Sequence, residues 1–247
     1  RLPDGRPMDQ AWIDDLRAHT LPYAVPVVVD GEWEQRVIGR VFSAWDETLM
    51  QQAEPPLART YKVALGIDHG SKVGKQIAVL CYVQDSGEHD VVWVADEYVG
   101  VEGSTISDDA RGILAMMQRN GLRWKMLDHA WGDRLYIRGS LDRKSNRDLM
   151  REIGRVLGVP YRSLSPWIRT VKRGAGRGRG SVDAGCRYLH QAMIRPGHFF
   201  VHPRCLKLSE SLMRWDYSDN EHKDAIDALR YGLQSFIFRG DRGKQAT

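Results

Sequence analysis

The sequence predicts an α/β fold in which helices flank a mixed central sheet. Three strand-like runs follow one another closely, at residues 61–68, 76–84 and 90–99, with polar or glycine-containing turns between them. Helical patterns then alternate with short extended runs up to residue 238. The close spacing of the first three runs favours an antiparallel meander, and the later helices favour crossovers that add strands beside it.

Length and composition fit one domain with appendages. The chain has 247 residues, of which 42% are hydrophobic, so it can bury a substantial core. Its net charge of +4 suits a polyanionic partner without requiring one. Three widely spaced cysteines without a CxxC motif argue against a disulfide framework or a structural zinc site, and they favour a reducing compartment. No apolar run approaches the ~20 residues that span a bilayer, so we expect no membrane segment.

Residues 1–59 are expected to form an arm or linker before the domain. They combine a short helical pattern at 8–19 with several prolines, among them the adjacent Pro55 and Pro56. The first residue is not Met and no signal-peptide pattern is present, so we expect a fragment of a longer chain. The domain itself is predicted at 60–238, with a C-terminal tail at 239–247.

The first crossover is expected to place a new strand beside the first strand of the meander. Residues 104–120 have apolar positions at helical spacing, and Asn120 with Gly121 stops the pattern. The run 124–128 that follows is largely apolar and ends on Asp128. A helical connection between 90–99 and 124–128 is how a parallel strand is added, so we expect Asp128 to lie next to Asp68.

The remainder of the chain reads as helices with two short extended pieces. Helical patterns occur at 146–157, 182–194, 204–215 and 223–238, and the extended pieces are 161–164 and 199–201. The predicted order of elements is that of an RNase H-like core: three strands, a helix, a strand, a helix, a short strand and terminal helices.

Carboxylates at the ends of these elements predict a metal site for phosphodiester cleavage. Asp68 closes the first strand, Asp128 closes the run 124–128 and Asp224 opens the last helix. Two Mg²⁺ or Mn²⁺ ions roughly 4 Å apart can activate a water and stabilise a leaving oxygen, and carboxylates are their natural ligands. We expect Asp68 to bridge the two ions, with Asp128 on one and Asp224 on the other. Without metal these groups would repel one another.

Each candidate also has a structural interpretation. An aspartate at a strand end is often a turn residue, and one at a helix start is often a cap. Asp227 lies on nearly the same helix face as Asp224, so it is either a fourth ligand or a residue that holds the helix against the sheet. His222 is an accessory candidate, whereas His69 and His129 should point away from the cluster because adjacent strand residues face opposite sides. The reserve carboxylates are Asp96, Glu97 and Asp133.

Two basic loops are candidate DNA contacts. Residues 70–76 resemble a phosphate-binding loop, but the glycine spacing is one residue short and Gln76 stands where Ser or Thr should bind Mg²⁺, so we interpret it as a hairpin turn. Residues 172–180 carry four positive charges and four glycines, which fits either a surface loop without a partner or sequence-independent contact with phosphates. The candidate DNA-binding residues are Lys72, Lys75, Lys172, Arg173, Arg177 and Arg179, with Arg143, Lys144, Arg147 and Arg151 extending the same surface.

Three stretches near the C-terminus form a pattern: residues 195–205, the helix at 208–215, and 222–232, where Asp-Ala-Leu-Arg-Tyr stands at 227–231. These stretches resemble the nuclease domain of the large terminase subunit of tailed bacteriophages. Residues 66–70 resemble the first-strand motif of that family, and 33–45 resemble the connector after its ATPase domain. The resemblance covers roughly 60–238, and Lys223 departs from it because the family often has the first Asp of an Asp pair there.

This resemblance implies an RNase H-like nuclease that cuts double-stranded concatemeric viral DNA during genome packaging, with little sequence specificity, inside the infected host cell. It carries Asp68, Asp128 and Asp224 over as metal ligands. For the full-length protein it implies an ATPase domain and contacts with the portal protein and the small terminase subunit. The isolated domain is expected to be monomeric and to cut DNA without translocating it.

Two other functions stay open on the sequence. One is a different RNase H-like enzyme, such as a Holliday-junction resolvase or a transposase catalytic domain. The other is a DNA-binding module that grips DNA through its basic loops without cutting it, and this module would bind in a salt-dependent way.

Overall fold

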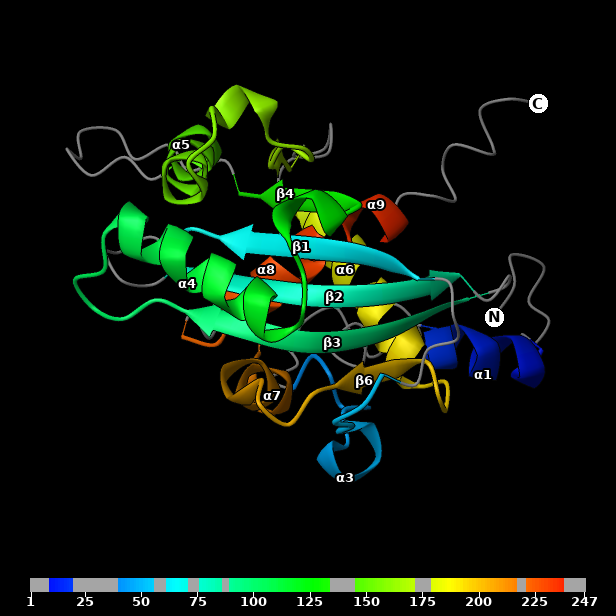
Figure 1. Ribbon diagram of the computed structural model, residues 1–247. Coiled ribbons are helices and arrows are strands. Elements are labelled where there is room, and N and C mark those ends of the chain that lie inside the picture. The colour runs from blue at the N-terminus through cyan, green and yellow to red at the C-terminus, as the bar shows by residue number, and fades with distance from the viewer. Residues whose placement is uncertain are drawn as a thin grey trace, which may run out of the picture.

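The fold is described from a computed structural model, in which residues 9–19, 40–55, 61–70, 76–85, 89–133, 145–171, 179–216 and 221–237 are placed. Within these residues, six strands form one mixed sheet with helices on both faces (Figure 1). The predicted fold class is therefore confirmed. None of the helices in these ranges is long and apolar enough to cross a membrane.

The predicted meander forms the centre of the sheet. Strands β1 (Lys62–Asp68), β2 (Ile77–Asp85) and β3 (Asp90–Val99) pair antiparallel in chain order, with a register shift between Leu80 and Cys81. Every residue of β1 after Lys62 is buried. A strand covered on both faces needs apolar side chains in both directions, which explains why β1 reads as a continuous apolar run.

Parallel strands extend the meander at both edges. Strand β4 (His129–Gly132) lies beside β1, and β5 (Arg169–Thr170) lies beside β4. On the other side, β6 (Phe199–Val201) pairs with β3. The order across the sheet is β5-β4-β1-β2-β3-β6. The helical crossover that the sequence predicted is present, because α4 connects β3 to β4, which lies parallel to β1.

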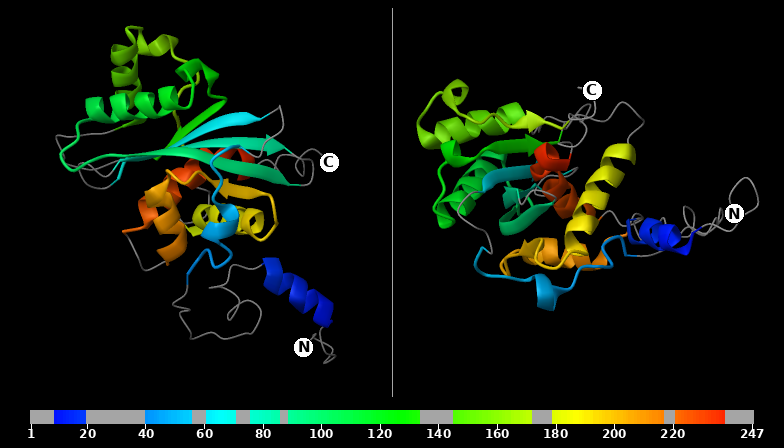
Figure 2. Two further views of the ribbon diagram at one scale, coloured as in Figure 1. Left: turned by 60° about the horizontal axis from the view of Figure 1, so that its bottom comes forward. Right: turned by 90° about the vertical axis from the view of Figure 1, so that its right-hand side faces the viewer.

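Helices α4 (Ile106–Arg119) and α5 (Asn146–Leu157) cover one face of the sheet (Figure 2). Thr105 and Asp108 form a reciprocal capping box at the start of α4. Gly158, with φ of 67°, ends α5 in the left-handed conformation that glycine adopts without steric cost. Asn120 is the C-cap of α4, which confirms the helix stop predicted there.

The opposite face is covered by the C-terminal helices α6 (Arg179–Met193), α7 (Leu206–Arg214), α8 (Lys223–Gly232) and α9 (Gln234–Ile237). The predicted helix at 223–238 is thus divided into α8 and α9. Helix α1 (Gln10–His19) contains no buried residue, and α3 (Glu47–Met50) is capped by Asp46.

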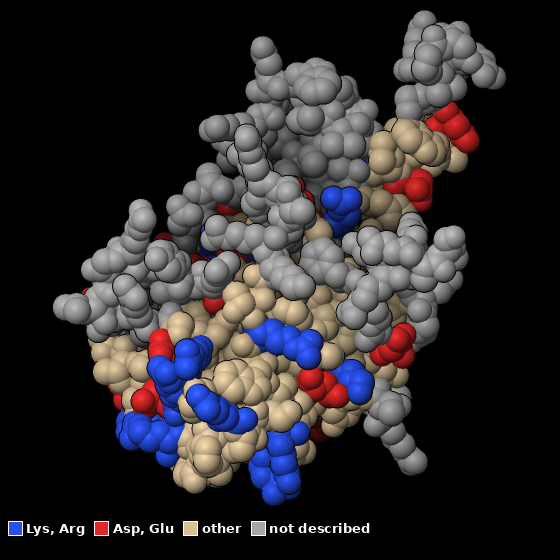
Figure 3. All heavy atoms as spheres, turned by 90° about the horizontal axis from the view of Figure 1, so that it is seen from above, with Lys and Arg blue, Asp and Glu red and all other residues tan. Residues whose placement is uncertain are grey.

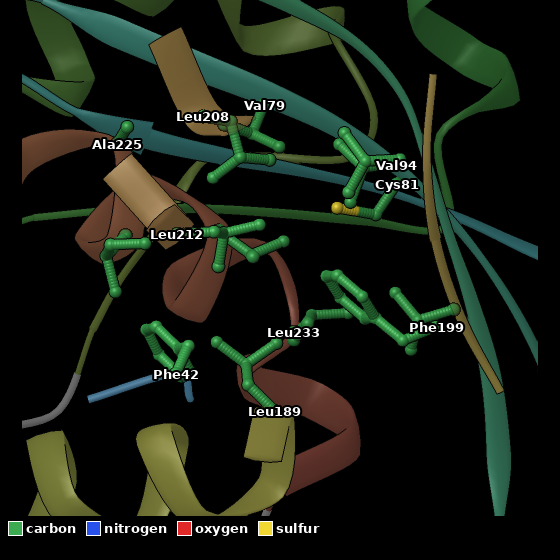
Figure 4. Packing of buried hydrophobic residues seen from close by; sticks show 14 of the residues in the cluster. Phe42, Val79, Cys81, Val94, Leu189, Phe199, Leu208, Leu212, Ala225 and Leu233 are labelled. Carbon is green, nitrogen blue, oxygen red and sulfur yellow. The ribbon is translucent and has the colours of Figure 1, made fainter. Parts of the chain in front are cut away.

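Part of the segment predicted as an arm packs into the core. Val41 and Phe42 are fully buried and Trp45 is nearly so. Phe42 points into the same apolar cluster as Leu189 and Leu212, which come from α6 and α7 (Figure 4). Apolar contacts therefore hold this segment against the helical layer.

Two short runs predicted as strands are 3-10 helices. Trp124–Met126 and Tyr161–Ser163 each make a tight turn, and the strands begin later, at His129 and at Arg169. Short apolar runs do not distinguish a strand from a buried turn by periodicity, which is why the sequence pattern was misleading here.

Candidate active site

Asp68 stands at the end of β1 and faces the layer of C-terminal helices. Strand residues alternate between faces, and Ala64 belongs to the core cluster under α8, whereas Leu65 and Ile67 belong to the cluster under α4 and α5. Asp68 therefore points to the α8 side. It is buried, and one of its carboxylate oxygens accepts a hydrogen bond from the backbone N–H of Gly70 at 2.8 Å.

Glycines allow α8 to lie directly on the backbone of β1. A methyl group on Gly66 would overlap the carbonyl oxygen of Ala228 and the backbone nitrogen of Gly232. A methyl group on Gly232 would lie 3.0 Å from the nitrogen of Gly66. This close approach brings the first turns of α8, with Asp224 and Asp227, to the end of β1 where Asp68 stands.

Asp133 is the second strand-end carboxylate of the site. Strands β1 and β4 are parallel, with Ile67 opposite Gly132, and Asp133 is the next residue. Its backbone N–H donates to the carbonyl oxygen of Ile67 at 3.1 Å, which continues the ladder by one residue. Asp133 therefore lies beside Asp68, a position that the sequence had assigned to Asp128.

Asp128 lies at the wrong end of the sheet, so the prediction that it neighbours Asp68 is wrong. One carboxylate oxygen accepts a hydrogen bond from the backbone N–H of Val63 at 2.9 Å, and the other lies 3.0 Å from Nζ of Lys62. Val63 and Asp68 are five residues apart along β1, which is roughly 16 Å of extended strand. Asp128 closes the start of the β1–β4 pair and does not belong to the carboxylate cluster.

Burial and neighbouring negative charges raise the pKa of Asp68 to about 8. Burial is the largest cause, because a charged carboxylate is poorly solvated there. The hydrogen bond from Gly70 opposes the shift, and the charges of Asp227, Asp224 and Asp133 add to it. In the absence of a cation, Asp68 therefore holds a proton at neutral pH.

Asp227 is a member of the same cluster and is also held by cations. Its carboxylate contacts the guanidinium of Arg230 and lies 3.6 Å from Nζ of Lys223. Burial raises the pKa of Asp227, the two cations lower it, and the charge of Asp133 raises it further. Asp227 therefore faces the other carboxylates, and both of its ion-pair partners lie on α8 itself.

Tyr231 borders the carboxylates, and the sequence reasoning did not single it out. Burial raises the pKa of its hydroxyl, and the charges of Asp227, Asp68 and Asp133 raise it further. The available signal was spacing, since Tyr231 follows Asp227 by four residues and therefore shares its helix face.

A buried polar network supports the loop side of the cluster. The ring nitrogens of His69 lie 3.3 Å from the side-chain oxygen of Gln76 and 2.8 Å from that of Asn146. The side-chain nitrogen of Asn146 donates to the carbonyl oxygens of Gly132 and Asp133, at 3.3 and 3.2 Å. His69 thus lies outside the carboxylate cluster as predicted, and through Asn146 it fixes the backbone that carries Asp133.

The other sequence candidates have different positions. Asp96 binds Arg119 through two hydrogen bonds of 2.9 and 3.0 Å. Glu97 accepts hydrogen bonds from the first turn of α7, and burial raises the pKa of Glu97 to about 7. One ring nitrogen of His222 lies 3.6 Å from the carboxylate of Glu210 on α7. Outside the described residues lie Lys72, Lys75, Lys172, Arg173, Arg177 and the side chain of Arg179.

The donor set of the cluster fits a hard divalent cation. Its candidate ligands are carboxylate oxygens, the donors that Mg²⁺ and Mn²⁺ prefer. Among the described residues, no three His, Cys, Asp or Glu side chains are arranged closely enough to hold a metal ion as they stand. A cation would offset the burial of the Asp68 charge and its repulsion by the neighbouring carboxylates, which together raise the pKa of Asp68, so the electrostatics also fit a cation.

The domain is of the α/β class, with a mixed sheet and with carboxylates near the ends of the inner strands β1 and β4, and comparison with solved structures gives the particular fold. The nuclease domain of the P22 large terminase is 17% identical, with a TM-score of 0.55 over 81% of this chain and 94% of that chain. The large terminase of a thermophilic bacteriophage is 13% identical, with a TM-score of 0.58 over 95% of this chain and 54% of that chain.

These likenesses show that the chain has the fold of the large-terminase nuclease domain across most of its length. At such low identity they show the fold alone. The chain spans about half of the thermophilic phage protein, which is 54% covered. The nuclease domain of the SPP1 large terminase with bound Mn also matches, at a TM-score of only 0.45. No family model and no curated protein matches the sequence.

Proposed function

We propose that this chain is a metal-dependent endonuclease domain that hydrolyses double-stranded DNA, with little sequence specificity, during viral genome packaging. The observation that carries the proposal is the burial of Asp68 beside Asp133, Asp224 and Asp227. Gathering like charges in a buried position destabilises a fold unless a cation balances them. The fold of large-terminase nuclease domains supports the same activity.

Four carboxylates are the proposed ligands of two Mg²⁺ or Mn²⁺ ions. Asp68 takes the central position between the ions, because the charges of the three other carboxylates all act on it. Asp133 takes the role that the sequence had given to Asp128, and Asp224 and Asp227 come from α8. Bound ions would supply an activated water and stabilisation of the leaving oxygen.

The protein's own residues orient these ligands and control their charge. Arg230 and Lys223 oppose the rise in the pKa of Asp227 that burial causes, and their contacts hold its carboxylate in place. Tyr231 has a raised pKa and so keeps its proton at neutral pH, which leaves its hydroxyl able to donate a hydrogen bond to a nearby oxygen. Asn146 fixes the backbone of Asp133. His222 remains a proposed accessory residue, and its contact with Glu210 is the one to disrupt in a test.

The test is conversion of supercoiled plasmid to nicked and linear DNA with Mn²⁺, Mg²⁺ or EDTA. Asp68→Asn and Asp133→Asn keep the size of the side chain and remove its charge, and both should abolish cutting. Asp128→Asn is the matched control, because its carboxylate lies at the other end of β1 and pairs with Lys62. Loss of cutting in Asp128→Asn together with full activity in Asp133→Asn would contradict the assignment.

The same experiment separates the other functions. Cleavage confined to branched DNA would favour a resolvase, and joining of DNA ends would favour a transposase domain. A wild-type protein that binds plasmid but does not cut it with either metal would favour a non-cleaving DNA-binding module.

The wider setting follows the family that the fold resembles and is part of the same proposal. A longer protein would add an ATPase domain, and the portal protein and the small terminase subunit would be its partners in the host cytoplasm. The division into an arm at 1–59, a nuclease domain at 60–238 and a tail at 239–247 belongs to this proposal, as does a monomeric state of the isolated domain.

A further inference from the structure

Three arginines surround one tyrosine on the outer side of α5. Arg147 and Arg162 each lie within hydrogen-bonding distance of the hydroxyl oxygen of Tyr161, at 3.5 and 3.4 Å. The guanidinium carbons of Arg151 and Arg162 lie 5.6 and 5.9 Å from the centre of the Tyr161 ring. We call these four residues the Tyr161 cluster. The three arginines are exposed.

The positive charge of the Tyr161 cluster is poorly balanced by the protein. Among the described residues, no carboxylate forms an ion pair with Arg147 or Arg162. Arg151 pairs with Asp148 at 3.0 Å, but the Arg151 side chain is 48% exposed and that of Asp148 is 34% exposed, and pairs so open to water stabilise little. Hydrogen bonds from Arg162 and Arg147 lower the pKa of Tyr161 to about 8, so the cluster favours a negative charge at its centre.

Phosphate is the anion that best fits this arrangement. Guanidinium groups bind phosphate oxygens through paired hydrogen bonds, and two of them converge here on one oxygen atom. Arg155 follows Arg151 by four residues and so extends the same helix side by about 6 Å. Trp167 is 41% exposed and packs edge-on against Tyr161 with ring centres 5.7 Å apart, which leaves a flat apolar surface beside the charges.

The start of α5, where Arg147 stands, lies at the strand ends that carry the carboxylates. Helix α5 begins at Asn146, which donates a hydrogen bond to the carbonyl oxygen of Asp133, and Arg147 is the next residue. Figure 3 shows the face seen from above Figure 1, to which α5 belongs. Lys and Arg side chains spread over its described part, with Asp and Glu side chains between them. A polyanion bound along α5 that extends past Asn146 would therefore come to the ends of β1 and β4, over which it has to pass to reach carboxylates that face α8.

We propose that Arg147, Arg151, Arg162 and Tyr161 bind backbone phosphates of duplex DNA and hold the duplex against the carboxylate cluster. The choice of DNA rests on the proposed nuclease function, whereas the phosphate chemistry rests on the arginine geometry alone. Phosphate contacts fix the position of a duplex without reading its sequence, which suits an enzyme of little sequence specificity.

The test compares two double variants in binding to a short fluorescent duplex, measured by anisotropy in EDTA so that no cutting occurs. R147Q/R162Q removes the two guanidinium charges that contact the Tyr161 hydroxyl and keeps most of the apolar part of each side chain. R111Q/R214Q is the control. Arg111 is 59% exposed and pairs with Asp108 on α4, and Arg214 is 63% exposed and pairs with Glu210 on α7, each at 3.2 Å. Neither arginine lies on α5.

R147Q/R162Q should bind the duplex at least roughly tenfold more weakly at moderate salt, and its slope of log affinity against log salt should fall by about 1.8, or about 0.9 for each phosphate contact. The control should match the wild type in both. Wild-type affinity and slope in R147Q/R162Q would overturn the proposal, even if plasmid cutting is normal. If the proposed nuclease function is wrong, the wild-type protein will still bind the duplex but will not cut plasmid with Mg²⁺ or Mn²⁺, so the two failures can be told apart.

A second measurement excludes a purely structural role. The Tyr161 hydroxyl can be titrated by NMR with ¹³Cζ-labelled tyrosine, and Tyr161→Phe identifies its signal. Added duplex should raise the pKa of Tyr161, because phosphates neutralise the neighbouring guanidinium charges. An unchanged titration would show that the arginines only tie α5 to the following turn. Polyglutamate that binds as tightly as DNA and shifts the titration equally would point to an acidic protein partner instead.

Discussion

Replacing Asp68 with asparagine should stabilise the metal-free protein by an amount that grows with pH. The pKa of Asp68 is raised to about 8, whereas an unfolded aspartate has a pKa near 3.9. Between these two values the folded state holds a proton that the unfolded state releases. Stability is therefore lost progressively as the pH rises from about 4 to about 8. Asparagine does not titrate, and its side-chain oxygen can still accept the hydrogen bond from Gly70.

The magnitude follows from the separation of the two pKa values. Each pH unit in this window costs about 1.4 kcal/mol, so the wild type loses about 1–2 kcal/mol by pH 5 and about 4 kcal/mol by pH 7. For a chain of this size, 1 kcal/mol changes the melting temperature by about 2–4 °C. The difference in melting temperature between Asp68→Asn and the wild type should thus increase by roughly 5–10 °C between pH 5 and pH 7.

The assay is thermal unfolding of both proteins at pH 5, 6, 7 and 8, with EDTA and with Mn²⁺. A metal present at 100 times its dissociation constant stabilises by about 2.7 kcal/mol, and this gain should appear in the wild type and largely vanish in Asp68→Asn. Metal binding displaces the proton of Asp68, so the gain should be larger at pH 8 than at pH 6. A constant difference between the two proteins at all four pH values would refute the buried, protonated Asp68.

Three further changes test the frame around the site. Gly66→Ala should destabilise the fold by about 1–3 kcal/mol in urea unfolding because its methyl group would meet the backbone of α8, and an unchanged midpoint would contradict that contact. Asn146→Ala should cost about 1–3 kcal/mol and slow plasmid cutting, since it leaves His69 and two carbonyl oxygens with fewer partners. Arg230→Met should cost about 3–5 kcal/mol by leaving the buried Asp227 with only the more distant, half-exposed cation of Lys223, and Asp227→Asn in the same protein should recover most of the loss in a double-mutant cycle. Equal stability of the single and double variants would argue against this ion pair.

Much of the architecture was predictable because it follows from local pattern. The strands at 61–68, 76–84 and 90–99 became β1, β2 and β3 with boundaries shifted by at most one residue. The helix stops at Asn120 and Gly158 also follow from local chemistry. These features depend on alternation, apolar spacing and glycine conformation, all of which act between residues close in sequence.

The second strand-end carboxylate was not predictable, because it depends on register. A run ending at Asp128 and a strand ending just before Asp133 both place an aspartate after apolar residues. The choice is made by the turn at Trp124–Met126, which delays the strand until His129 and so places Asp133 opposite Asp68. A shift of five residues in a parallel pair moves a side chain from one end of the sheet to the other.

The sequence by itself determined the α/β class, the helical crossover, the position of Asp68 at a strand end and the position of Asp224 at a helix start. Those conclusions need only local propensity and the chemistry of carboxylates. The tertiary structure decided that Asp133 and not Asp128 joins Asp68, that α8 lies on Gly66, and that Asn146 and Tyr231 border the cluster. These relations join residues far apart in the chain, and their distances are set by strand register and helix packing, which no local pattern encodes.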